Sequence, residues 1–120
     1  MTQHATRTVG DVMSAPVVTA TGGESVTAAA ARMDQNGVGA VVVVEDDRPI
    51  GILTERDLVR QSAGGSVNGA SVEHWMTPDP DCVSPSASVQ EAFAHLAERG
   101  YRHFPVVEDD ELVGIVSLRG

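Results

Sequence analysis

The residues best suited to chemistry lie in one short stretch, GILTERDLV, which contains Thr54, Arg56 and Asp57. If a helix begins here after a strand, the Thr54 hydroxyl lies at a helix N-terminus, where unpaired N–H groups and the helix dipole favour a phosphate. The Asp57 carboxylate can accept two hydrogen bonds from the adjacent hydroxyls of a ribose, and Arg56 and Arg60 can offset phosphate charge. The same spacing is that of a capping box, in which Thr54 and Asp57 satisfy each other's backbone groups. The pattern therefore allows a nucleotide contact, a helix cap, or both.

The composition narrows the classes of function. The 120 residues are 42% hydrophobic but only 3% aromatic, so the core must consist of Val, Ile, Leu and Ala. The net charge is −9 and all 8 cations are Arg, which argues against a nucleic-acid partner, because phosphate neutralisation needs a basic face. The single cysteine, Cys82, allows neither an intramolecular disulfide nor a zinc site. No apolar run has the length of a signal peptide or a membrane span, which predicts a cytoplasmic protein with no membrane partner.

An internal repeat organises the chain. Met13 and Met76 align at an offset of 63 residues (76 − 13 = 63), and the acidic runs 45–47 and 108–110 align at the same offset. The register holds without a gap to the end of the chain, so the duplication is not a chance match. The sequence therefore predicts two copies of one motif, residues 8–60 and 71–120, joined by a Gly- and Ser-rich linker at 61–70.

Each copy has the pattern β–α–β–β–α. A short capped helical turn and a short extended stretch precede an amphipathic helix; in the first copy Val26, Ala29 and Met33 repeat with helical spacing, Ser25 is the cap and Gly37 the stop. Two β-branched strands follow, split by an acidic hairpin turn. The strands joined through the helix should pair in parallel and the hairpin antiparallel. Because a motif of about fifty residues buries too little surface to stand alone, we expect an α+β fold with the two pseudo-symmetric motifs packed sheet to sheet.

These features resemble a tandem cystathionine-β-synthase-type (CBS) domain pair, or Bateman module. The resemblance covers nearly the whole chain and is carried by DVMSAPVVT, NGVGAVVVVEDD and PIGILTERDLV in the first copy and by WMTPDPDCV and YRHFPVVEDDELVGIVS in the second. It implies a regulatory module rather than an enzyme, with no required cofactor. Members bind AMP, ADP, ATP or S-adenosylmethionine in clefts between the copies, and some bind only metal ions or nothing. The partners it implies are an adenine nucleotide, a second copy in a homodimer, and a fused or associated effector; small members are similar to stand-alone bacterial proteins.

The resemblance also implies the residues that would hold the ligand. Backbone groups at 19–20 would meet the adenine edge, and the small residues at 39–40 would leave room for a flat base. Arg102 and His103, in the second copy, would face the ligand phosphates. No catalytic or metal-ligating residue is expected. The predicted ligand-binding set is Thr19, Ala20, Gly39, Ala40, Thr54, Arg56, Asp57, Arg102, His103, Pro105, Ser117 and Arg119.

The second copy departs from this pattern at its end. Ser117 aligns with Thr54, but Gly120 aligns with Asp57, and the last helix is missing. We therefore expect one competent and one impaired site, or a fragment of a longer chain. The alternative function is a ligand-independent dimerisation or regulatory module of a larger enzyme or transporter. A hydrolase using Asp57 and His103 is disfavoured, because no activated nucleophile is evident.

Overall fold

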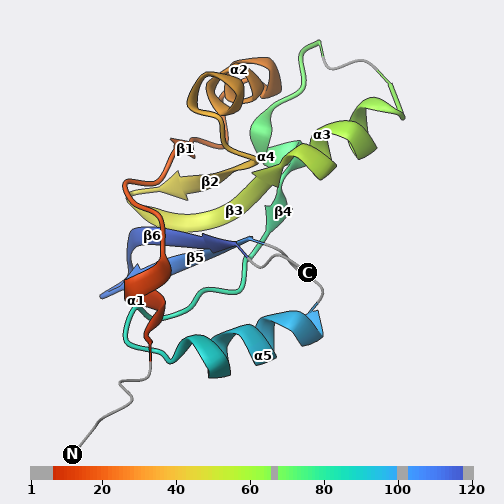
Figure 1. Ribbon diagram of the computed structural model, residues 1–120. Coiled ribbons are helices and arrows are strands. Elements are labelled where there is room, and N and C mark those ends of the chain that lie inside the picture. The colour runs from red at the N-terminus through yellow and green to blue at the C-terminus, as the bar shows by residue number, and fades with distance from the viewer. Residues whose placement is uncertain (1–6, 66–67, 100–102, 118–120) are drawn as a thin grey trace, which may run out of the picture. The chain divides into compact units, whose positions relative to one another are not determined.

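The computed structural model describes residues 7–65, 68–99 and 103–117. They form two compact units, one comprising Val17–Pro80 and the other comprising the described parts of Met1–Pro16 and Asp81–Gly120. Each unit takes its hairpin and long helix from one repeat and a short helix from the opening segment of the other repeat (Figure 1). The repeats therefore exchange their opening segments, which the repeat offset alone does not show.

The unit Val17–Pro80 is built on a four-stranded sheet with the strand order β1-β2-β3-β4. β1 and β2 are parallel, and β2 and β3 form an antiparallel hairpin, which confirms both predicted pairings. The fourth strand is an addition to the prediction: Thr77 pairs with Ile52 of β3. The elements in chain order are β1 (Thr19–Ala20), α2 (Val26–Asn36), β2 (Ala40–Glu45), β3 (Arg48–Thr54), α3 (Glu55–Ser62), α4 (Val72–Trp75) and β4 (Thr77–Pro78).

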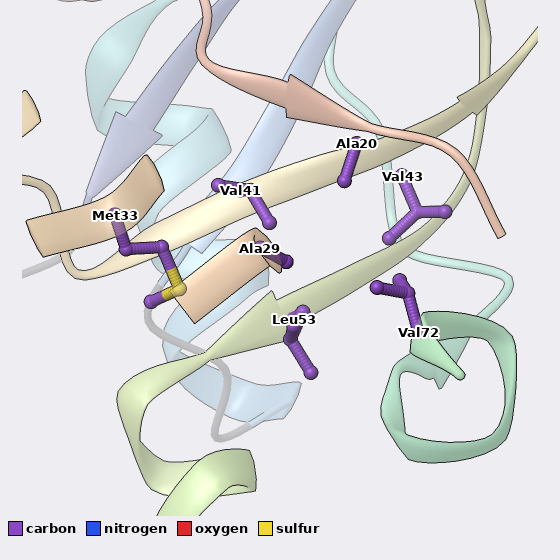
Figure 2. Packing of buried hydrophobic residues seen from close by; sticks show 7 residues of the cluster. All are labelled: Ala20, Ala29, Met33, Val41, Val43, Leu53 and Val72. Carbon is purple, nitrogen blue, oxygen red and sulfur yellow. The ribbon is translucent and has the colours of Figure 1, made fainter. Parts of the chain in front are cut away.

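Helix α2 begins and ends where its sequence predicts. The Ser25 hydroxyl accepts the Ala28 N–H at 3.1 Å, and Gly37, with a φ of 64°, ends the helix in the left-handed conformation. Its buried face joins the core of the unit, where side chains from β1, α2, β2, β3 and α4 meet (Figure 2). The buried members of this core are Ala20, Ala29, Met33, Val41, Val43, Leu53 and Val72.

The other unit contains α1 (Val9–Val12), α5 (Val89–Arg99) and the antiparallel hairpin of β5 (His103–Glu108) and β6 (Glu111–Ser117). Single residues extend the hairpin on both sides: Val83 bridges to Val106 in parallel, and Ser14 bridges to Ile115. Helix α5 packs against the hairpin through a second core (Figure 1). The buried members of this core are Val9, Ala92, Phe104, Val106 and Val116.

Both hairpins turn on a pair of aspartates in the left-handed conformation. Asp46 and Asp47 have φ values of 52° and 64°, and Asp109 and Asp110 have values of 53° and 66°. Two consecutive residues with positive φ form the tight turn that matches strand twist, and Asp tolerates this conformation better than most residues. The repeated acidic run therefore has a structural origin in the turns.

The short helices differ in their caps. Thr8 of α1 forms a capping box with Asp11. The sequence predicts an N-cap at Ser71 of α4 as well, but the Ser71 hydroxyl makes no cap bond and pairs with His74 Nδ1 at 2.9 Å. Because His74 replaces the carboxylate at the third helical position, the reciprocal bond of the capping box cannot form there.

Candidate functional site

Thr54 and Asp57 form a complete capping box at the junction of β3 and α3. Thr54 Oγ1 accepts the Asp57 N–H at 3.1 Å, and Asp57 Oδ2 accepts the Thr54 N–H at 2.9 Å and the Thr54 hydroxyl at 3.0 Å. Only 8% of the Asp57 surface is exposed. The helix-cap interpretation of this pair is confirmed.

The cap leaves one oxygen of Asp57 uncommitted. Both hydrogen bonds that the Asp57 side chain accepts from described residues go to Oδ2, and Oδ1 bonds to no group in the described part of the chain. Among the described side chains no polar atom is both buried and without a hydrogen-bond partner, so Oδ1 is not sealed in the core as an unsatisfied acceptor. The carboxylate is therefore held in place by Thr54 and still presents an acceptor, which a ligand hydroxyl can use.

The small residues predicted to flank a base lie next to this cap. Ala40, the first residue of β2, pairs with Thr54 in the sheet, and the Gly39 carbonyl accepts the Glu55 N–H at 3.0 Å. A Cβ at Gly39 would lie 3.7 Å from the Glu55 carboxyl carbon, so the absence of a side chain leaves space beside that carboxylate. The fold thus brings Gly39, Ala40, Thr54 and Asp57 together.

The geometry is less favourable to a phosphate at the start of α3 than the sequence suggests. The Glu55 N–H bonds to Gly39 and the Asp57 N–H bonds to Thr54, so two of the donors expected for a phosphate are occupied. The first turn also carries the carboxylates of Glu55 and Asp57, which repel an anion. Arg56 is exposed in the same turn and is the cation available there.

β1 places its two predicted residues in different environments. The Ala20 side chain is 2% exposed and points into the core of its unit (Figure 2). Thr19 is half-buried, and its carbonyl oxygen accepts a hydrogen bond from Arg32 Nη1 at 2.8 Å. Arg32 in turn pairs with Glu24.

The remaining predicted residues belong to the other unit. His103 is half-buried at the start of β5, opposite the exposed Ser117 of β6, and Pro105 is buried in β5, where its carbonyl accepts the Val83 N–H at 3.0 Å. Arg102 and Arg119 lie outside the described residues.

Comparisons with known proteins decide the family. The sequence model of the CBS domain matches residues 9–64 and again 72–120. The chain belongs to the CBS domain family. Together with the two units, these matches confirm the α+β fold with two CBS motifs. The relatives include the uncharacterized protein MK0525 of Methanopyrus kandleri (36% identity over 92% of this chain and 59% of that protein) and hypoxic response protein 1 of Mycobacterium tuberculosis (35%, 92% and 79%).

Two solved structures have the same fold as this CBS pair. Hypoxic Response Protein I, crystallised with two coordinated zinc ions, matches with a TM-score of 0.79 and 34% identity over 92% of each chain. The CBS domain pair of protein MJ0100, in complex with 5′-methylthioadenosine and S-adenosyl-L-methionine, matches with a TM-score of 0.84 and 25% identity over 92% of this chain and 88% of that one. The chain spans 59% and 58% of the first two curated relatives, from Methanopyrus kandleri and Acidianus ambivalens.

Sequence reasoning missed two residues of this CBS pair that bond to the backbone at and just after β1. Arg32 and Glu24 reach the backbone of Thr19 and Thr21, although neither belongs to a recognisable motif. The available signal was a difference between the repeats, because the positions 63 residues later carry His95 and Ala87 instead (32 + 63 = 95; 24 + 63 = 87).

The described segments of the CBS pair show no features of a metal centre or a membrane span. Within residues 7–65, 68–99 and 103–117, no group of three or more His, Cys, Asp or Glu side chains is placed to hold a metal ion. Partial burial of the thiol, together with the Asp81 carboxylate, raises the pKa of Cys82, which disfavours the reactive thiolate. None of the helices in these segments is long and apolar enough to cross a bilayer.

Proposed function

We propose that this CBS pair is a regulatory module that binds an adenosine-containing ligand at the start of α3. The observation that carries the proposal is the Asp57 carboxylate, which is 8% exposed, fixed by Thr54 through one oxygen and open to a ligand through the other. A carboxylate in this state selects hydroxyl donors such as those of a ribose. The complex of the MJ0100 domain pair with two adenosine-containing ligands supports the ligand class.

The charge around Asp57 suggests an order among such ligands. Glu55 and Asp57 both lie in the first turn of α3, and the chain carries a net charge of −9. Each added phosphate increases repulsion at this point, whereas the ribose contact is unchanged. We therefore expect S-adenosylmethionine and AMP to bind more tightly than ATP, with the difference shrinking as salt is added.

A thermal-unfolding panel with adenosine, AMP, ADP, ATP, NAD and S-adenosylmethionine tests the proposal. A ligand present at a hundred times its dissociation constant adds about 2.7 kcal/mol to the free energy of unfolding. Asp57→Asn should remove most of this gain. Asp11→Asn is the matched control, since Asp11 holds the same position in the capping box of α1.

Two results would count against the ligand site. One is the absence of any shift at millimolar ligand, and the other is an equal shift in the wild type and in Asp57→Asn. A rise in unfolding temperature with zinc alone would instead favour zinc as the ligand, the ion coordinated in the Hypoxic Response Protein I structure.

A second function is a ligand-independent dimerisation module within a larger assembly. Val59 is the residue with which to test it: this large apolar side chain of α3 is 71% exposed. We expect a homodimer in solution that Val59→Glu dissociates, as measured by light scattering on a sizing column. A dimer that persists in Val59→Glu would remove α3 from the interface.

A further inference from the structure

The outward-facing edge of β1 is closed by side chains rather than by another strand. Among the described strands β1 is the outer one of its sheet, and its partner there is β2. Val42 of β2 donates to the Val18 carbonyl at 3.2 Å, and the alternation of peptide groups along a strand then directs the Thr19 carbonyl to the opposite edge. There it accepts from Arg32 Nη1 at 2.8 Å.

Glu24 completes this closure. Its carboxylate pairs with the two terminal guanidinium nitrogens, Arg32 Nη2 at 2.5 Å and Nη1 at 3.3 Å, and accepts the Thr21 N–H at 2.6 Å. One ion pair therefore satisfies the carbonyl of Thr19 and the N–H of Thr21. The planar fork of arginine suits this double task, because it donates in two fixed directions.

The loop that carries Glu24 is anchored on its other side as well. The Glu24 carbonyl accepts the Val72 N–H at 2.9 Å, and the Gly22 carbonyl accepts the Glu73 N–H at 3.0 Å. Arg32 extends from α2, whose neighbouring residue Met33 is buried in the core. The pair thus links a strand edge to elements that are themselves fixed.

The second repeat forms the equivalent helix and hairpin without this pair. Its corresponding residues, Ala87 and His95, cannot form a carboxylate–guanidinium contact, yet α5, β5 and β6 are present. The long helix and hairpin of a repeat therefore do not require the pair, whereas the stretch equivalent to β1 is reduced in the second repeat to a single bridge between Val83 and Val106. It occurs in the copy that retains Asp57, the residue on which the ligand site depends.

We propose that Arg32 and Glu24 are positioning residues of the ligand site, which hold the outward backbone groups of residues 19–21 in the geometry that meets the edge of a nucleobase. The inference rests on the proposed function, and in particular on the expectation that the backbone at 19–20 meets the adenine edge of the ligand. The N–H and carbonyl of Thr19 face one edge and offer a donor and an acceptor, and a carbonyl oxygen has a second lone pair for a ligand donor.

Amide hydrogen exchange in the free protein tests the structural half of the proposal. We expect the Thr21 amide to exchange about tenfold faster in Glu24→Ala, which removes a hydrogen bond to a charged acceptor. Glu24→Gln should restore most of the protection, because the amide oxygen can still accept. Arg48→Gln is the charge-matched control, since Arg48 is an exposed arginine at the start of β3. Unchanged exchange at Thr21 in Glu24→Ala would overturn the proposal.

Calorimetric titration with AMP and S-adenosylmethionine tests the functional half. We expect Arg32→Gln and Glu24→Ala to weaken binding about tenfold, with Glu24→Gln and Arg48→Gln close to wild type. Equal affinity in wild type and Arg32→Gln would overturn the positioning role and leave the proposed function standing. Tighter binding in Arg32→Gln would also overturn it, because the guanidinium would then compete with the ligand for Thr19. If wild type binds neither ligand, the proposed function fails, and the positioning role fails with it.

Discussion

Asp57 accepts two hydrogen bonds from Thr54 through Oδ2, while Oδ1 has no partner among the described residues. The two interpretations that the sequence left open are therefore compatible. The cap fixes the carboxylate without using all of its acceptor capacity, so a ligand need not break the helix terminus to bind. Pre-organisation of this kind lowers the entropy cost of binding, since the side chain is already ordered.

Removing the cap should cost stability even without ligand. We expect Thr54→Ala to lower the free energy of unfolding by about 1 kcal/mol, because the Asp57 N–H and carboxylate both lose a partner. Urea titration measures the change. Thr54→Ser should retain the stability of the wild type, because its hydroxyl can still form the cap. Thr8→Ala, at the equivalent cap of α1, should lower the free energy of unfolding by a similar amount. A Thr54→Ala variant as stable as wild type would show that water replaces the cap.

The Glu24–Arg32 pair predicts a pH dependence. The hydrogen bond from Arg32 holds the pKa of the Glu24 carboxyl below its ordinary value of 4.5. Stability from this carboxylate is therefore fully present above pH 4.5 and is lost as the pH falls through the lower folded-state pKa. We expect Glu24→Gln to unfold with a shallower pH dependence than wild type below that value, as measured by urea titration at several pH values. Parallel curves would contradict this.

Each hairpin packs against a methionine from the opening segment of the other repeat. Met76 packs on Gly51 of β3, and Met13 packs on Gly114 of β6, each so closely that a Cβ on the glycine would overlap the methionine sulfur. The glycines and methionines recur at the same offset, so the sequence preserves both partners of each contact. These contacts fix where the exchanged segment meets the sheet.

Filling this space should destabilise the sheet. We expect Gly51→Ala to lower the free energy of unfolding by about 1–3 kcal/mol, because the added methyl group displaces Met76. The double variant Gly51→Ala with Met76→Ala should lose less than the sum of the single changes, as measured by a double-mutant cycle in urea. Gly114→Ala is the equivalent variant in the other unit, and Gly23→Ala, with open space around it, is the control. Additive single changes would mean that the two residues are not in contact.

The molecule as a whole consists of two units with separate cores, each completed by a segment from the other repeat. Val9 is fully buried in the core with Phe104, and Val72 is fully buried in the core with Leu53. The opening segments are thus structural parts of the unit that they join.

Amide hydrogen exchange, measured residue by residue, can show which hairpin each opening segment stabilises. Val9→Ala should lower amide protection mainly in β5 and β6, at a cost of roughly 1–3 kcal/mol for the cavity, although Val9 is far from those strands in sequence. Val72→Ala should instead lower amide protection mainly in β2 and β3. A Val9→Ala variant that loses protection chiefly in β2 and β3 would contradict the assignment of the opening segment to the second repeat's hairpin.

Local features were predictable from the sequence because they depend on neighbours in the chain. The limits of α2 follow from Ser25 and Gly37, the hairpins follow from their acidic turns, and the Thr54–Asp57 cap follows from its spacing. The cap itself is confirmed, whereas the contacts predicted between these residues and a ligand remain a proposal.

Two features were decided only by the tertiary structure. Both repeats offer the same apolar pattern to an opening segment, so no local signal tells which hairpin Met13 or Met76 will join; the physical reason is that non-local packing chooses between two equivalent partners. The hydrogen bond from Arg32 to the Thr19 carbonyl depends likewise on the distance between a helix and a strand edge, which spacing along the chain does not encode. The sequence by itself determined the duplication, the order of the elements and their caps, because these follow from periodicity and from bonds between near neighbours.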